Sequence, residues 1–167
     1  KSRFIWLLIH LIAAILAAYV ISFFAGTMEE MIALAILMPI VAAMGGTASV
    51  QTLTVAVRAI AMKELTMSNA YRAIGKEVAV GILNGIIFAA IIGTVAWIWF
   101  GSPALGGVIG LAIGLNLIVA GFVGSSLPIV LQRLGFDPAV SSSAFLTSIT
   151  DIVGFYVFLG LAAALLF

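Results

Sequence analysis

Five long apolar stretches dominate this chain of 167 residues and limit what it can fold into. They cover residues 4–24, 31–57, 78–100, 103–131 and 138–167. A helix needs about 20 apolar residues to cross the hydrocarbon core of a bilayer, so each stretch is long enough for one span. The stretches do not alternate apolar and polar residues as barrel strands do. We therefore predict an all-α membrane protein in which residues 1–167 form a single transmembrane domain of five helices.

The positively charged residues give this domain an orientation. All seven Lys and Arg residues precede the first span, lie between the second and third, or follow the fourth. With an odd number of spans, these three segments fall on one side of the membrane, which the positive-inside rule makes cytoplasmic. We expect a multi-pass protein of the plasma membrane whose N-terminus is cytoplasmic and whose C-terminus is outside.

Composition and motifs exclude several classes of function. Hydrophobic residues make up 65% of the chain, charged residues 8%, and no basic run suits nucleic acid. Cysteine is absent, which excludes disulfides and thiolate metal sites. The one histidine, His10, has no partner at a catalytic or zinc-motif spacing, and we expect it to be packed or interfacial. The chain is not expected to be an enzyme.

Local chemistry marks several helix ends. Ser102 and Asp137 each precede a proline, the pattern of an N-cap followed by a first helical residue, and so begin the fourth and fifth spans. Gly135 is placed to end the fourth span in a left-handed conformation. Residues 27–30 match a capping box, which predicts that the second span opens at Thr27.

A carboxylate in the fifth span is the leading functional candidate. Asp151 lies in an otherwise apolar stretch, where an ionisable side chain costs roughly 2.5–3.5 kcal/mol and normally faces a partner or an ion path. Ser143, Thr147, Asp151 and Gly154 share one helical face at i, i+4, i+8 and i+11. Such a stripe suits hydrated Mg²⁺, which one or two carboxylates hold through retained water. The alternative is a protonated Asp151, or one paired with a buried donor such as Gln51 or Asn116.

A second polar cluster occupies residues 45–52 of the second span, and Thr47 and Gln51 are its candidate metal-site residues. It begins with Gly45 and Gly46, which weaken a helix. A break there would expose backbone carbonyls to a pore. The other interpretation is that the glycines admit a neighbouring helix, and the sequence favours neither.

Several of these residues belong to one familiar pattern. It comprises Pro39, Gly45-Gly46, Gln51 and Arg58-Ala59 in the second span, Gly124 and Pro128 in the fourth, the turn Arg133-Leu134-Gly135-Phe136-Asp137-Pro138-Ala139, and Thr147 with Asp151-Ile152-Val153-Gly154. The pattern resembles the MgtE family of magnesium channels and transporters. The turn followed by the acid is its most specific part. The chain differs from the family at Thr47-Ala48-Ser49-Val50-Gln51, where N-x-G-N-Q is common.

The resemblance implies a function and an assembly. It implies a homodimer of five-helix protomers surrounded by lipid, a cation pore along the two-fold interface, and Asp151 as the selectivity residue for Mg²⁺, with Mn²⁺ or Co²⁺ as other candidate ions. Family members often carry an N-terminal cytosolic regulatory domain that this sequence lacks, and the chain starts at Lys1, so we expect a piece of a longer protein. A proton-coupled secondary transporter and a non-transporting membrane scaffold remain the alternatives.

Overall fold

The computed structural model follows the backbone from Lys1 to Phe167 and describes all side chains except those of residue 2 and residues 139–142. Its helices are α1 (Ser2–Ser22), α2 (Ala25–Glu30), α3 (Ile32–Ala61), α4 (Ala70–Phe100), α5 (Pro103–Arg133) and α6 (Pro138–Leu165). Within the described residues, every helix except the short α2 contains a stretch long and apolar enough to cross a membrane. The predicted five-helix, all-α membrane fold is confirmed.

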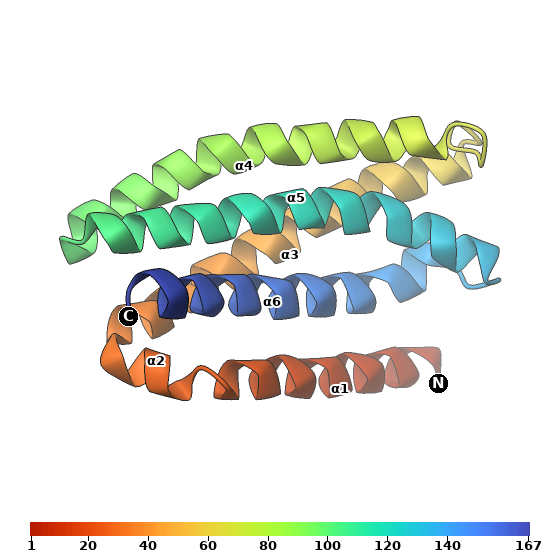
Figure 1. Ribbon diagram of the computed structural model, residues 1–167. Coiled ribbons are helices and arrows are strands. Elements are labelled where there is room, and N and C mark those ends of the chain that lie inside the picture. The colour runs from red at the N-terminus through yellow and green to blue at the C-terminus, as the bar shows by residue number, and fades with distance from the viewer.

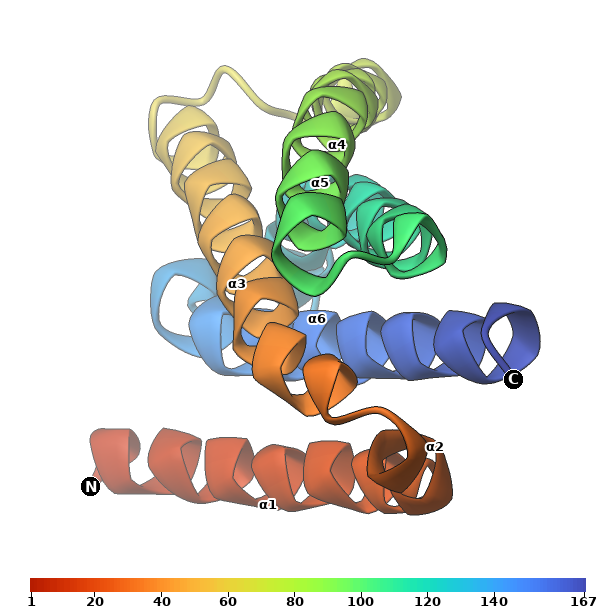
Figure 2. The same cartoon turned by 90° about the vertical axis from the view of Figure 1, so that its left-hand side faces the viewer.

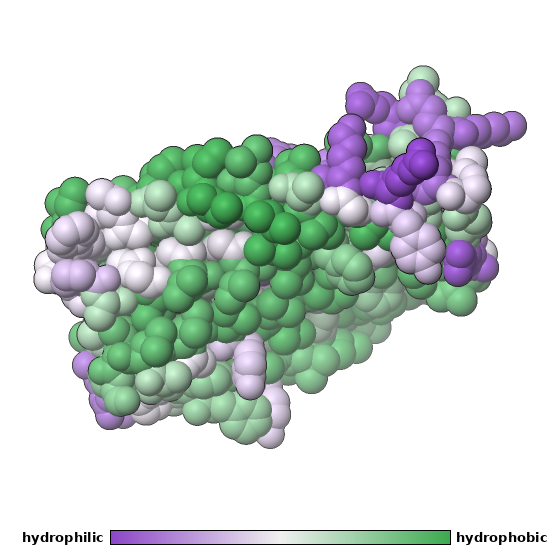
Figure 3. All heavy atoms as spheres, turned by 45° about the horizontal axis from the view of Figure 1, so that its top comes forward, coloured by the Kyte–Doolittle hydropathy of each residue, from purple (hydrophilic) through white to green (hydrophobic). Residues whose placement is uncertain are grey.

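The connections place the chain ends at opposite ends of the bundle (Figure 1). Helices α1, α4 and α6 run in one direction, and α3 and α5 run in the other. The N-terminus, the α3–α4 loop and the α5–α6 turn therefore share one end. Figure 3 shows hydrophilic side chains gathered at the end with the α3–α4 loop, beside a broad apolar surface over the helices.

Helix ends follow local chemistry in some places and depart from it in others. The Ser102 hydroxyl accepts a hydrogen bond from the Leu105 amide at 3.2 Å, and Gly135 is left-handed with φ of 85°, as predicted. The capping-box prediction at Thr27 was wrong, because Thr27 lies inside α2 and the extended residue Met31 precedes α3. A separate one-to-two-turn helix thus replaces the predicted helix start.

The α3–α4 loop explains why α4 begins earlier than its apolar stretch. The Asn69 side chain accepts a hydrogen bond from the Thr66 amide and donates one to the Glu64 carbonyl, both at 2.7 Å. This bridge closes the loop directly before Ala70, where α4 begins, rather than at the predicted Val78. Hydropathy marked the part of the helix that suits lipid, and the helix itself continues into polar sequence.

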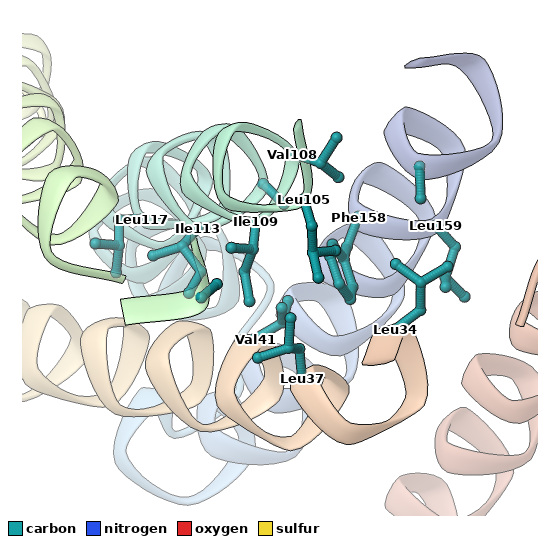
Figure 4. Close-up of a cluster of buried hydrophobic side chains, with 13 residues drawn as sticks. Leu34, Leu37, Val41, Leu105, Val108, Ile109, Ile113, Leu117, Phe158 and Leu159 are labelled. Carbon is teal, nitrogen blue, oxygen red and sulfur yellow. The ribbon is translucent and has the colours of Figure 1, made fainter. Parts of the chain in front are cut away.

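Helix α5 forms the centre of the molecule. More than half of its most apolar window is buried inside the protein, against 11% for α4 and 6% for α1. Its side chains Ile109 and Ile113 meet Leu37 and Val41 of α3, while Phe158 of α6 fills the same cluster (Figure 4). The core therefore lies between α3, α5 and α6.

Glycines bring α4 and α5 into backbone contact on the other side of α5. A β-carbon at Gly85 would lie 2.9 Å from the Gly114 carbonyl oxygen, and one at Gly81 would lie 2.8 Å from the Leu117 oxygen. Small residues permit this approach, which stabilises helix pairs in lipid through close packing. Gly81 and Gly85 of α4, with the glycines of α5, thus serve close helix packing.

Helix α1 stands outside this core and packs on α6. Figure 2 shows α1 and α6 lying side by side and crossing the direction of α3, α4 and α5. Ala17 is the one described α1 residue that is buried. The packing of α1 on α6 positions the site described next.

Candidate functional site: the polar stripe of the last helix

The predicted stripe on α6 is present and runs from an open cavity into the core. Ser143 is exposed, whereas Thr147 and Asp151 are partly buried. Gly154 is fully packed, because a β-carbon there would lie 2.7 Å from Asn116 Nδ2 and 3.0 Å from a Val41 methyl group. Asp151 therefore lies between a hollow at the N-terminal half of α6 and the junction of α3, α5 and α6.

The hollow is a cavity of about 500 Å³ between α1 and α6, called here the α1–α6 cavity. It is lined by Arg3, Trp6, Leu7, His10, Ser143, Ala144 and Thr147. Trp6 closes one side, with its ring 5.8 Å from Phe145 and 6.4 Å from Phe136 in edge-on contacts. Two of the predicted site residues, Ser143 and Thr147, thus face the same space.

His10 is a polar residue of this site that sequence reasoning passed over. It lines the cavity from α1 and is partly buried, and its Nδ1 atom is buried with no hydrogen-bond partner among the described residues. It shares this cavity with Ser143 and Thr147 of the polar stripe. A lone histidine inside an apolar span was the only signal in the sequence, and it did not identify α6 as the neighbour.

The two candidates from α3 lie elsewhere in the protomer. Thr47 and Gln51 are both exposed. Gln51 lines a separate cavity of about 290 Å³ between α3, α4 and α5, together with Glu77 and Asn84. A single protomer therefore groups Asp151 with Thr147 and Ser143, and does not bring Thr47 or Gln51 to them.

Helix α3 stays helical through its paired glycines. A β-carbon at Gly45 would collide with Asn116 and would lie 3.3 Å from Thr150 Cβ, while Gly46 faces open space. Of the two interpretations of this pair, admission of a neighbouring helix is the one that the packing supports at Gly45. No carbonyl-exposing break is present in α3.

Asn116 occupies the centre of the helix junction and is 1% exposed. Its Nδ2 donates to the Val41 carbonyl at 3.4 Å, and its Oδ1 is buried without a described partner. Neither Asn116 nor Gln51 hydrogen-bonds to Asp151 among the described contacts. The side-chain pair suggested as an alternative role for Asp151 is therefore absent from this part of the structure.

The donor set around Asp151 suits a hydrated ion. Among the described residues, no three His, Cys, Asp or Glu side chains come together as a metal cage. Mg²⁺ dehydrates reluctantly, keeps several waters and is commonly held by one or two carboxylates. Asp151 and the preceding hydroxyl groups of Ser143 and Thr147 are oxygen donors of the kind that such an ion uses.

Comparison with known proteins agrees with the family resemblance seen in the sequence. Residues 38–161 match the MgtE family model, described as a divalent cation transporter, and this match contains Asp151 and all of α4 and α5. The chain is 32% identical over 162 residues to the magnesium transporter MgtE of Bacillus subtilis strain 168, covering 97% of this chain and 36% of that protein.

Two further relatives agree. Identity is 34% over 163 residues to magnesium transporter MgtE of Enterococcus faecalis, and 32% over 166 residues to that of Thermus thermophilus. These alignments cover 98% and 99% of this chain, which spans 36% of the length of each relative. The chain belongs to the MgtE family of divalent cation transporters.

Proposed function

We propose that this chain forms the membrane pore of a divalent cation transporter, with Mg²⁺ as its principal ion and Asp151 as the selecting carboxylate. The observation that carries the proposal is the position of Asp151, the one acidic side chain in the middle of α6, on the same face as Thr147 and Ser143. Charged side chains are rare inside membrane spans, and those that occur commonly line an ion path. The relatives named as magnesium transporters support Mg²⁺ as the ion.

A homodimer is part of this proposal. One Asp151 gives a dication a single negative charge, while a two-fold axis beside α6 would double that charge without another residue. Rings of acidic side chains select cations in this way. Thr47 and Gln51, which are exposed on α3, would then face a second protomer at the interface rather than the α1–α6 cavity.

The distribution of Lys and Arg residues predicts how the protein is oriented in the membrane. The end of the bundle that holds the N-terminus and the α3–α4 loop also carries the Lys and Arg residues. By the positive-inside rule this end is cytoplasmic, and the C-terminus lies outside.

The test is Mg²⁺ flux into liposomes that contain the purified protein, compared with Asp151→Asn. At an effective dielectric constant of about 20, a unit charge pair 4 Å apart is worth about 4 kcal/mol, so we expect flux to fall by at least about tenfold. Glu64→Gln, which removes an exposed loop carboxylate, is the charge-matched control and should transport normally.

Other results would favour other functions. Flux that stops when a protonophore collapses the pH gradient would indicate a proton-coupled transporter. Equal flux in wild type and Asp151→Asn, with both proteins folded, would remove Asp151 from the ion path. No flux in either protein would support a membrane scaffold.

A further inference from the structure

The junction of α3, α5 and α6 contains a polar side chain that the proposed ion path does not use. Asn116 of α5 is 1% exposed, so it cannot contact an ion in a cavity. Its amide group lies between α3, which carries Thr47 and Gln51, and α6, which carries Asp151. Asn116 can therefore act on the proposed site only through the positions of these two helices.

The amide group of Asn116 is in close contact with both helices. A β-carbon at Gly45 of α3 would collide with Asn116 Nδ2, and one at Gly154 of α6 would lie 2.7 Å from Nδ2 and 3.3 Å from Cγ. Each glycine thus leaves room for one side of the amide group. A close-packed interior transmits a change of volume to its neighbours, because it has no empty space to absorb the change.

Packing explains the amide group at this position better than hydrogen bonding does. Asn116 Nδ2 donates to the Val41 carbonyl at a long distance of 3.4 Å, and Oδ1 is buried without a partner among the described residues. A buried amide that is half satisfied adds little net stability, because the unpaired oxygen keeps its desolvation cost. The amide group therefore acts mainly as a spacer of fixed size between α3 and α6.

Gly154 connects this spacer to the acid of the polar stripe. Asp151 precedes Gly154 by three residues on the same face of α6, which is about 4.5 Å along the helix axis. We propose that Asn116 is a positioning residue for ion binding: it fixes the spacing of α6 from α3 and α5, and thereby the place of the Asp151 carboxylate. The inference rests on the proposed role of Asp151 in the ion path.

Mg²⁺ flux measured over a range of Mg²⁺ concentrations tests this role. Asn116→Ala removes the spacer, and Gly154→Ala adds a methyl group that presses on it from α6. Both changes displace Asp151 and leave its carboxylate intact. We expect the half-saturating Mg²⁺ concentration to rise by about tenfold, as when a residue that orients a metal ligand is lost. The maximal flux per folded protein should change less than this concentration does.

Gly160→Ala is the control for an added methyl group on the same helix. A β-carbon at Gly160 would meet nothing within 4 Å, so both the half-saturating concentration and the maximal flux should stay as in wild type.

A double variant separates positioning from a loss of stability. Of the three atoms nearest to a β-carbon at Gly45, two belong to Asn116 and the third is Thr150 Cβ at 3.3 Å. Gly45→Ala therefore places a methyl group in the space that Asn116→Ala empties. The double variant should return the half-saturating concentration toward the wild-type value. A loss of stability alone would lower the amount of folded protein and leave this concentration unchanged.

Ion binding can also be followed without transport. A ligand that binds the folded state raises the midpoint of thermal unfolding. The Mg²⁺ concentration that gives half of this rise should shift in Asn116→Ala and Gly154→Ala by the same factor as the half-saturating concentration for flux. Asp151→Asn should reduce the rise itself.

The outcomes separate this inference from the proposed function. Unchanged half-saturating concentrations in Asn116→Ala and Gly154→Ala, with flux still dependent on Asp151, would overturn the inference alone. So would a raised concentration that the double variant with Gly45→Ala fails to lower, because volume should replace a spacer. If one of the two single variants does not fold, the other decides. Equal flux in wild type and Asp151→Asn would overturn the proposed function, and the inference with it.

Discussion

At the scale of single residues, Asn116 joins three helices through its shape. Its amide group fills the space left by the missing β-carbons of Gly45 on α3 and Gly154 on α6. Its hydrogen bond to Val41 is long, at 3.4 Å, and its Oδ1 is unpaired among the described residues. The contact surface of this side chain, more than its polarity, therefore sets how closely α3 and α6 approach α5.

This arrangement predicts that Gly45 and Asn116 are energetically coupled. Gly45→Ala should lower the free energy of unfolding by about 1–3 kcal/mol, because its new methyl group collides with Asn116. In an Asn116→Ala background, the same change should cost less, with a coupling energy of about 0.5–3 kcal/mol. Unfolding in detergent measures each variant. Gly46→Ala is the control, because its new methyl group would meet no atom within 4 Å and its effect should add to that of Asn116→Ala. If the effects of Gly45→Ala and Asn116→Ala were also additive, the predicted coupling would be contradicted.

The sequence predicted part of the residue-level site. Helical spacing was enough to place Ser143, Thr147 and Asp151 on one face, because the helix itself fixes that geometry. The approach of His10 depends on how α1 packs on α6, and one span gives no signal of its neighbour. Thr47 was predicted as a metal-site residue from the polar cluster of the second span, and packing within one protomer leaves it exposed.

At the scale of helices, the α4–α5 pair depends on glycines whose neighbours are backbone atoms. A β-carbon at Gly106 would collide with the Gly93 carbonyl oxygen, while one at Gly107 would meet nothing within 4 Å. Backbone cannot rotate away as a flexible side chain can. We predict that Gly106→Ala lowers the free energy of unfolding by about 1–3 kcal/mol. Gly107→Ala should be neutral or should stabilise the helix by about 0.5–1 kcal/mol.

Thermal unfolding in detergent distinguishes these adjacent variants. A lower midpoint for Gly106→Ala than for Gly107→Ala is the expected result. Equal midpoints would mean that the two helices separate easily, and that close approach contributes little to stability.

Helix ends were predictable where a single side chain or glycine controls them. Ser102 caps α5 and Gly135 is left-handed after it, both from local chemistry. Hydropathy placed the start of the second span at residue 31, next to Ile32 where α3 begins, whereas the capping chemistry of Thr27 belongs to the separate helix α2. Likewise, the start of α4 depends on the loop bridge made by Asn69, which hydropathy does not detect.

At the scale of the whole molecule, alternating helix direction gathers charge at one end. The five spans and their order were predictable, since each stretch must be long enough to cross the bilayer. The pairing of α1 with α6 and the tight contact of α4 with α5 were not, because all five stretches are similarly apolar. The common end for the N-terminus, the α3–α4 loop and the α5–α6 turn was also predictable, because the order of the spans decides which connections share a side.

The proposed orientation of that end can be measured by labelling single introduced cysteines, because the chain has no cysteine of its own. Ser68→Cys puts a thiol in the α3–α4 loop, and Ala104→Cys puts one in the first turn of α5 at the opposite end; both positions are exposed. In intact cells, a membrane-impermeant maleimide should label Ala104→Cys and leave Ser68→Cys unmodified. Opening the cells should make Ser68→Cys reactive, which shows that its thiol was shielded by the membrane rather than by the fold. The reverse pattern would contradict a cytoplasmic N-terminus, and it would place the basic end of the bundle outside the cell.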